Sequence, residues 1–422
     1  PTAGATRSEE VVKEKGDARA QAVGGGAIIV PYRSPSPKFS RNVLISRDFS
    51  HYPYQTEPSI AVDPSDSDHL VVGMIDYNFP CVTSYVSIDG GATWDGPFQA
   101  RYLEQDLGSG GDPTVAFDRR RNVYFSYISI GTEEFTIGSI PFYEEVSSIV
   151  VSKSDDGGYT WSRPIPTARS TITVKRDEIT LGFLDKPWMT LGPNPESLDQ
   201  DIVYVTYTHF KMHWQIIYIF EGQYFYLGNP VLETTIELVR STDGGLTWST
   251  PIAVSPTVRH LYGGQVEAST LGYTQRVVQG SNIGVAADGA VYVSWLDTTD
   301  DGSFKGLASI YVVKSSDGGR TFSKPKTVAT FLEPGFSPRT AFFRSWGAAF
   351  PQIAVGPEGD VSIVFAARPP DRPTDDGDIY FTRSLDQGES WSRPKRLNDD
   401  EKAHFQFFPA IAVGSDSVIH VI

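Results

Sequence analysis

The stretch Ser87-Ile88-Asp89-Gly90-Gly91-Ala92-Thr93-Trp94 recurs four more times along this chain. The other copies read SDDGGYTW from Ser154, STDGGLTW from Ser241, SSDGGRTF from Ser315 and SLDQGESW from Ser384. All five place Ser, Asp, Gly, a hydroxyl residue and an aromatic ring in the same order. The copies begin roughly 65 to 90 residues apart, and repetition at such a spacing indicates an array of similar units.

Each repeat predicts a β-hairpin whose turn is the motif itself. Runs of β-forming residues precede the copies, as in Ile149 to Val151 and Ile310 to Val313, and a shorter apolar run follows a polar segment. Asp accepts hydrogen bonds from nearby N–H groups, Gly supplies positive φ, and the final ring can be buried under the hairpin. We therefore expect the repeated aspartates to be structural: Asp89, Asp156, Asp243, Asp317 and Asp386.

A second element repeats between these turns, a short apolar strand that is usually introduced by proline. Its copies begin at Glu57-Pro58, Asp112-Pro113, Lys186-Pro187, Gly280-Ser281, Phe350-Pro351 and Phe408-Pro409. Small residues suit a crowded innermost strand, and proline is tolerated as the first residue of a strand. A further strand follows each copy, so each unit reads as four strands. The six copies predict six units, with the last split between the two chain ends.

The repeated turn resembles the Asp box, or bacterial neuraminidase repeat, of the sialidase-like β-propellers. The resemblance extends from about residue 27 to the end of the chain. It implies an all-β fold over residues 27–422, a six-bladed β-propeller of four-stranded antiparallel blades. The sixth blade would be closed by N- and C-terminal strands, and residues 1–26 would form a flexible tail. Propellers with this motif include glycosidases and non-enzymatic receptors.

The composition restricts the partners. The 422 residues carry a formal net charge of −15, which argues against binding to nucleic acid. The single cysteine, Cys81, excludes a disulfide within these residues, and no apolar run is long enough to span a bilayer. We expect a glycan or glycoconjugate as partner and no required cofactor. A secreted or cell-surface location is implied by the resemblance alone, and the oligomeric state is not predicted.

The expected function lies away from the conspicuous repeats. In a propeller the turns between third and fourth strands share one face, whereas the loops before the first strand and after the second open on the other face, the mouth. Glu57 and Asp112 lie on the mouth side and are predicted to bind substrate. The insert at residues 209–233 is predicted to be a hairpin packed on the rim, an aromatic wall for a sugar, or a subunit contact.

A sialidase-like site needs a proton donor, an activated tyrosine and arginines that bind the substrate carboxylate. By position, the resemblance implies Asp76 as the acid–base residue. It implies Glu267 as the base that activates Tyr262 or Tyr273 as the nucleophile. The arginines that would bind the carboxylate are Arg276, Arg344 and Arg368.

The first blade departs from the family pattern. It opens with Gln55-Thr56-Glu57-Pro58, where sialidases usually carry an arginine, and a carboxylate there would repel a sialic acid. The leading hypothesis is a glycoside hydrolase that cleaves terminal sialic or related acidic sugars from glycans. The alternatives are a non-catalytic carbohydrate- or protein-binding propeller and another polysaccharide-acting propeller enzyme. Arginines converging beside a Tyr–Glu pair would favour the sialidase, whereas scattered arginines and an acidic centre would favour the binding protein.

Two acidic turns could hold Ca²⁺ through hard oxygen ligands. One contains Asp297, Asp300 and Asp301, and the other runs from Asp375 to Asp378. A solvated acidic turn is the favoured explanation of each of them, so calcium is an option and not a requirement. The sequence holds no H-E-x-x-H, P-loop or G-x-G-x-x-G motif.

Overall fold

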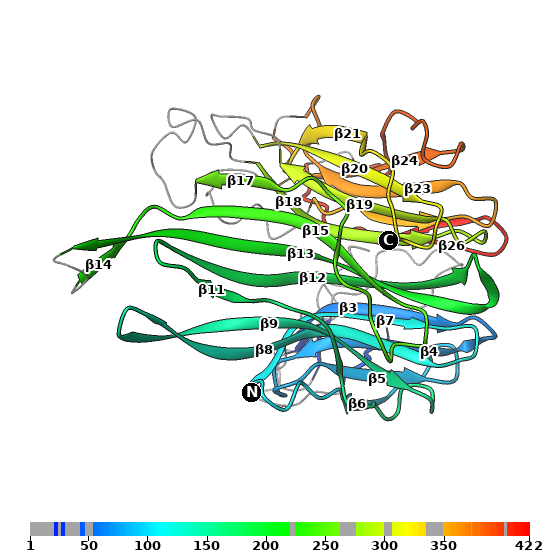
Figure 1. Ribbon diagram of the computed structural model, residues 1–422. Helices are drawn as coiled ribbons and strands as arrows, with labels where there is room; N and C mark the ends of the chain where they lie inside the picture. The colour runs from blue at the N-terminus through cyan, green and yellow to red at the C-terminus, as the bar shows by residue number, and fades with distance from the viewer. Residues whose placement is uncertain are drawn as a thin grey trace, which may run out of the picture.

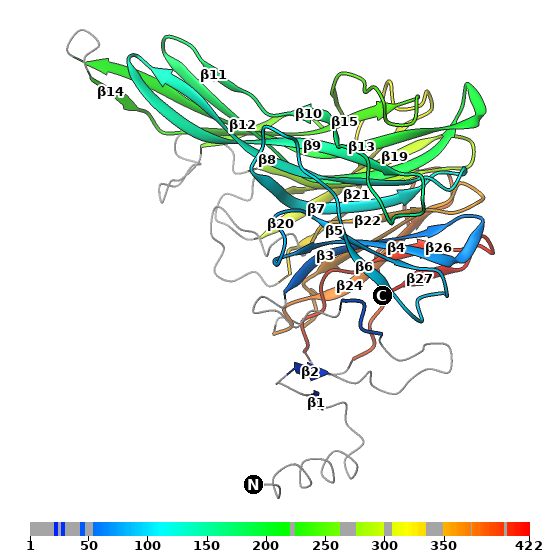
Figure 2. The ribbon, with the colours of Figure 1, turned by 90° about the horizontal axis from the view of Figure 1, so that it is seen from below.

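The structure is a computed structural model that describes residues 21–23, 27–29, 43–46, 54–219, 224–261, 276–298, 306–334, 349–372, 374–400 and 403–422. Within these ranges all regular secondary structure is β-strand. The sheets surround an axis that runs horizontally in Figures 1 and 2. This is the arrangement of a β-propeller, as the repeats predict. The described part contains no helix with the length and apolar character needed to cross a membrane.

Four sheets have four antiparallel strands in chain order, as predicted for propeller blades. The first contains β3 (Gln55–Asp63), β4 (Asp66–Asp76), β5 (Thr83–Ser87) and β6 (Asp95–Gln99). The second contains β7 (Gly108–Phe117), β8 (Val123–Ile137), β9 (Ile140–Ser154) and β10 (Ile165–Arg169). Two later sheets contain β18 (Val277–Val285), β19 (Val291–Thr298), β20 (Leu307–Ser315) and β21 (Lys326–Leu332), and β22 (Gln352–Val355), β23 (Val361–Ala367), β24 (Asp378–Ser384) and β25 (Lys395–Arg396).

The sheet between these two pairs has seven strands, so the prediction of four strands is wrong for it. Its long strands are β12 (Glu178–Asn194), β13 (Ser197–Ile219) and β15 (Val231–Ser241). Its short strands are β11 (Ile172–Val174), β14 (Tyr224–Leu227), β16 (Ile252–Ala253) and β17 (Val258–Leu261). The insert adds the extra length, because β13 runs on into it and pairs with β14. Figure 1 shows this hairpin projecting to the left, together with the β8–β9 hairpin.

The projecting hairpins share a small core of their own. Ile137 from β8, Ile179 from β12 and Ile216 from β13 are buried in one cluster. The rings of Phe142 in β9 and Phe225 in β14 meet edge to face, with centroids 6.1 Å apart. The insert is therefore packed against the neighbouring sheet's hairpin.

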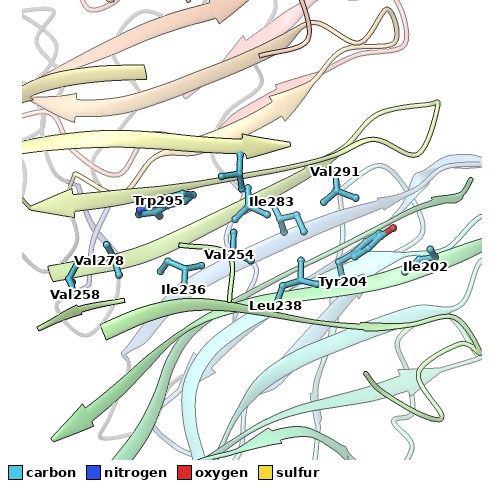
Figure 3. Packing of buried hydrophobic residues seen from close by; sticks show 12 residues of the cluster. Ile202, Tyr204, Ile236, Leu238, Val254, Val258, Val278, Ile283, Val291 and Trp295 are labelled. Carbon is cyan, nitrogen blue, oxygen red and sulfur yellow. The ribbon is translucent and has the colours of Figure 1, made fainter. Parts of the chain in front are cut away.

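Neighbouring sheets pack face to face through apolar side chains. Figure 3 shows the cluster between the seven-stranded sheet and the β18–β21 sheet, in which Tyr204, Leu238 and Trp295 are buried. The adjacent Val203 and Val205 belong instead to the cluster on the other face, against the β7–β10 sheet. This alternation follows from the two-residue period of a strand. A sheet with a neighbour on each side thereby buries apolar side chains on both of its faces. This burial supplies the main stabilisation of the ring.

The five repeated turns share one hydrogen-bond pattern. Asp89 Oδ1 accepts bonds from Thr93 N and Ser87 Oγ, both at 2.8 Å, and Asp89 Oδ2 accepts one from Thr93 Oγ1 at 2.6 Å. The bonds from Thr93 and Ser87 lower the pKa of Asp89 to about 2. The same three bonds recur at Asp156, Asp243, Asp317 and Asp386. Each carboxylate therefore bonds within its own turn.

The described strands at the chain ends pair locally. β26 (Ile411–Val413) pairs with β27 (Ile419–Val421), as expected for the C-terminal part of the split unit, and β1 (Gln21–Val23), inside the predicted tail, pairs with β2 (Ala27–Ile29). Figures 1 and 2 together place β26 and β27, in red, next to the blue sheet of β3 to β6. Residues 43–46 form no strand, and Ile45 packs on apolar side chains of β4 and β5.

Candidate functional site

The innermost strands follow one another around the axis. β3 contacts β7, and the series continues through β12, β18, β22 and β26. Three of them carry a residue with left-handed backbone directly before a proline: Glu57 (φ 53°), Asp112 (φ 51°) and Lys186 (φ 54°). A break in the strand register accompanies each one. Such bulges re-aim side chains, and here they bring three charged groups together at the mouth.

Lys186 joins two carboxyl groups from neighbouring sheets. Its Nζ lies 2.7 Å from Glu57 Oε1 and is also hydrogen-bonded to Asp112 Oδ1. Backbone groups extend the network, because Asp112 N donates to Glu57 Oε2 at 3.0 Å and Lys186 N donates to Asp112 Oδ2 at 3.3 Å. Each carboxyl therefore binds the backbone of the next sheet as well as the shared ammonium group.

Burial shapes the ionisation of this cluster. The side chain of Asp112 is 11% exposed, against 38% for Glu57 and 30% for Lys186. Burial raises the pKa of Asp112, and burial together with the charge of Asp112 raises the pKa of Glu57. Burial alone would lower the pKa of Lys186, but the charges of Asp112 and Glu57 outweigh it and raise that pKa. The lysine therefore stays charged, while the carboxyl groups hold protons more readily than exposed ones do.

A third carboxyl group, Asp185, lies beside the cluster. Burial raises the pKa of Asp185, and Gln279 Nε2 in β18 donates a hydrogen bond to its Oδ2 at 3.3 Å. One lysine thus faces three carboxyl groups, so the cluster is negatively charged whenever more than one of them is ionised. In that state it would repel the carboxylate of an acidic sugar, as the sequence suggested for Glu57.

The later sheets place aromatic groups at the corresponding position. Phe408 precedes Pro409 and β26, has φ 54°, and is 59% exposed. Its ring centroid lies 5.0 Å from that of Phe407. In β18 the position is Gly280, with φ 66°, and a Cβ there would lie 2.3 Å from the ring of Phe350. The backbone favours glycine at that point, and the neighbouring ring leaves no room for a side chain.

Asp76, the predicted acid–base residue, ends β4 and is 2% exposed. Its Oδ1 accepts hydrogen bonds from Asn78 N at 3.0 Å and Asn78 Nδ2 at 2.7 Å, so it closes its own turn. Its partner across the strands is Gln55, two residues before Glu57. The structure therefore brings Asp76 to the mouth end of the first sheet, and its catalytic role stays a prediction.

The two described arginines predicted to bind a carboxylate are engaged by aspartates. Arg276 Nε lies 2.6 Å from Asp297 Oδ1 and its Nη2 binds Asp297 Oδ2, a bidentate pair. Arg368, which follows β23 in a different sheet from Arg276, donates from Nη2 to Asp376 Oδ1 at 2.8 Å. Asp297, a predicted calcium ligand, is thus the partner of Arg276. The remaining predicted residues lie outside the described ranges: Tyr262, Glu267, Tyr273, Asp300, Asp301 and Arg344.

A second acidic group gathers beside β24. Asp375, Asp378 and Asp400 each offer one oxygen, and these oxygens lie within 4.8 Å of one another. Arg372 Nη2, however, lies 3.2 Å from Asp375 Oδ2. Asn398 Nδ2 donates to Asp378 Oδ1 at 2.6 Å and to Asp400 Oδ1 at 2.5 Å. Because a guanidinium and an amide already face these oxygens, we assign no metal ion to them.

Sequence reasoning assigned no role to Lys186 and missed a Tyr–Glu pair in the third sheet. The repeated position before proline could have grouped Lys186 with Glu57 and Asp112. Tyr207 Oη donates to Glu237 Oε2 at 3.0 Å, and His209 Nδ1 lies 3.0 Å from Glu237 Oε1. Tyr207 is fully buried, and burial and the charge of Glu237 raise its pKa, so the phenol stays protonated and out of reach. This pair therefore supports the sheet.

No protein-family model and no curated protein sequence matches this chain. Solved structures of similar fold include sialidases and related propeller enzymes. A Hadza microbial sialidase has 14% identity and a TM-score of 0.44 over 87% of this chain and 62% of its own. An intramolecular trans-sialidase from Ruminococcus gnavus has 13% identity and a TM-score of 0.46, over 90% of this chain and 92% of its own. The α-L-arabinanase of Penicillium chrysogenum has 12% identity and a TM-score of 0.47, over 87% and 92%. The chain spans less than two thirds of the length of the first of these.

Proposed function

We propose that this protein is a glycoside hydrolase whose reactive centre is the cluster of Glu57, Asp112 and Lys186 at the propeller mouth. The observation that carries the proposal is a pair of carboxyl groups with raised pKa values that share one lysine. Pairs of acidic groups with perturbed ionisation in a concave site are candidates for acid–base chemistry. The repeated turns, on the opposite face, serve as scaffold.

The two carboxyl groups divide the chemistry by burial. Asp112, the more buried, would donate a proton to the leaving oxygen, whereas Glu57, the more exposed, would act as the carboxylate that faces the anomeric carbon. The two carboxyl groups are also hydrogen-bonded to each other, so they are closer together than the pair of an inverting glycosidase. Lys186 would hold Glu57 ionised and in place.

The sialidase form of this proposal draws on a different set of residues. It needs Asp76 as acid, with Glu267, Tyr262 or Tyr273 and the arginines, of which Arg276 and Arg368 are already paired. The acidic mouth favours a neutral glycan over a sialylated one. The second candidate is the non-catalytic binding propeller. The acidic mouth favours it, and so does the pairing of Arg276 and Arg368 with different aspartates.

The test is hydrolysis of a panel by purified protein: a fluorogenic sialoside, aryl glycosides of neutral sugars, arabinan and xylan. We expect release from a neutral substrate that is lost in Asp112→Asn and retained in Asp76→Asn. Glu389→Gln, on the opposite face, is the matched control and should keep full activity. Release from the sialoside that disappears only in Asp76→Asn would replace our proposal with the sialidase form. A folded protein that binds glycans and cleaves none would establish the binding propeller.

We also infer six blades. The described sheets from β3 to β27 account for six groups of strands around the axis, of which the last has two. Its missing strands would come from the N-terminal part of residues 27–422. Residues 1–26 would be the tail, except that residues 21–23 form β1 and pair with β2. A secreted or cell-surface location accords with action on glycans.

A further inference from the structure

Four residues of the chain occupy left-handed backbone immediately before a proline: Glu57, Asp112, Lys186 and Phe408. A side chain with a Cβ is disfavoured in this conformation, and only glycine adopts it freely. The fold itself accepts glycine at this point of the repeat, because Gly280 takes it in β18 with φ 66°. Retaining a side chain at the other four positions therefore calls for a compensating interaction or a function.

For three of these residues the compensation is visible. Glu57, Asp112 and Lys186 form the ionic network that links three neighbouring sheets. Phe408 is uncharged and 59% exposed, so burial of its side chain contributes little free energy to offset the strained backbone. Its aromatic neighbour in the described part of the chain is Phe407, itself 48% exposed, at a centroid distance of 5.0 Å. A strained, exposed ring at a repeated position points to a ligand.

The place of the ring in the propeller identifies what it would contact. β26 contacts β22 on one side and lies next to the blue sheet of β3 to β6 in Figures 1 and 2. Phe408 lies just before β26, and Glu57 lies at the start of β3. Because both are at the same end of an innermost strand, both lie on the mouth side of the propeller. The mouth therefore carries a cluster of charged, hydrogen-bonding groups at β3, β7 and β12 and an aromatic pair before β26.

We propose that Phe408, together with Phe407, is the stacking surface for a neutral sugar ring bound at the mouth. This inference rests on the proposed glycan-cleaving function and names its substrate class. A sugar ring presents an apolar face of C–H groups, which packs on an aromatic ring, and an edge of hydroxyl groups, which bind carboxylates and ammonium groups. The acidic part of the mouth selects a sugar without a carboxylate.

The decisive variant is Phe408→Gly, because it removes the ring and relieves the backbone at once. We expect its melting temperature to equal or exceed that of the parent, while its dissociation constant for arabinan or xylan, measured by affinity electrophoresis, rises at least about tenfold. Phe408→Trp should retain binding. Ser417→Gly is the matched control: Ser417 has φ 63° in the turn at the other end of β26, and its replacement should leave binding unchanged.

Each other outcome counts against a particular statement. A parent protein that binds and cleaves a polysaccharide, together with a Phe408→Gly variant that does both equally well, would overturn the stacking surface and leave the proposed function standing. A drop in melting temperature in Phe408→Gly with unchanged binding would show that the ring is structural. A folded parent that neither binds nor cleaves any probe of the panel would overturn the proposed function, and the stacking surface with it.

Discussion

Replacing Lys186 by methionine should destabilise the fold in a pH-dependent manner. The substitution keeps an unbranched apolar side chain, one atom shorter than lysine, and removes the charge that Glu57 and Asp112 share. Removing one partner of a fully buried ion pair costs about 3–5 kcal/mol, whereas exposed pairs contribute about 0–1 kcal/mol. Lys186 is 30% exposed, so we expect a loss of about 2–3 kcal/mol in the free energy of unfolding at pH 7.

The sign of the pH dependence follows from the raised pKa values. A carboxyl group whose pKa is higher in the folded state binds protons more tightly there, so acidification stabilises the fold and the benefit disappears as the pH rises through the folded pKa. Without Lys186, the pKa values of Asp112 and Glu57 should rise further. The deficit of the variant should therefore shrink between pH 7 and pH 5, as these groups take up protons.

Urea unfolding of both proteins at pH 7 and pH 5 tests this reasoning. Lys326→Met is the matched control, because Lys326 pairs with Glu389, which is 70% exposed, and its loss should change the free energy of unfolding by about 0–1 kcal/mol. A Lys186→Met variant as stable as the parent at pH 7 would mean that the cluster contributes nothing to stability. A deficit of equal size at both pH values would mean that the carboxyl groups do not titrate in this range.

Three further predictions concern the scaffold. Asp317→Ala removes the acceptor of hydrogen bonds from Thr321 and Ser315, so urea titrations should show a free energy of unfolding lower by about 1–2 kcal/mol. An unchanged free energy of unfolding would mean that these bonds do not stabilise the fold. Gly280→Ala places a Cβ against Phe350 on left-handed backbone and should lose roughly 2–4 kcal/mol, seen as a lower melting temperature. Gly138→Ala should lose less, because Gly138 shares the left-handed backbone but no atom lies within 4 Å of the added Cβ. The lowered pKa of the turn aspartates, about 2 at Asp89, means that their stabilisation is present above the unfolded value near 4 and is lost as the pH falls towards 2. Thermal unfolding from pH 5 to pH 2 should show that decline, and a flat profile would contradict it.

Much of the fold can be predicted from the sequence because its determinants are local. In each repeated turn, a carboxylate bonds to residues two and four positions away, so the motif contains all the groups that make the contact. The prolines before the inner strands mark the same point of each unit, although the sequence does not show that the residue before each proline is left-handed. That conformation appears only when the strand register on either side is known.

The candidate site depends on contacts between residues far apart in the chain. Lys186 bonds to Glu57 across 129 positions and to Asp112 across 74, and these partners meet only because consecutive sheets surround one axis. The family resemblance implied that Arg276 binds substrate, and Asp297 was a possible calcium ligand, yet the pairing of β18 with β19 brings them together. The two residues form a bidentate ion pair.

The sequence by itself therefore determined the repeating β-hairpins, because turn chemistry and strand periodicity act over a few residues, and the resemblance carried by those repeats implied the propeller and the face on which to look for function. Only the tertiary structure decided which charged groups are paired, that the third sheet has seven strands, and that the mouth has an acidic and an aromatic part. Those properties arise from burial and from distances across the ring, which no short stretch of the chain contains.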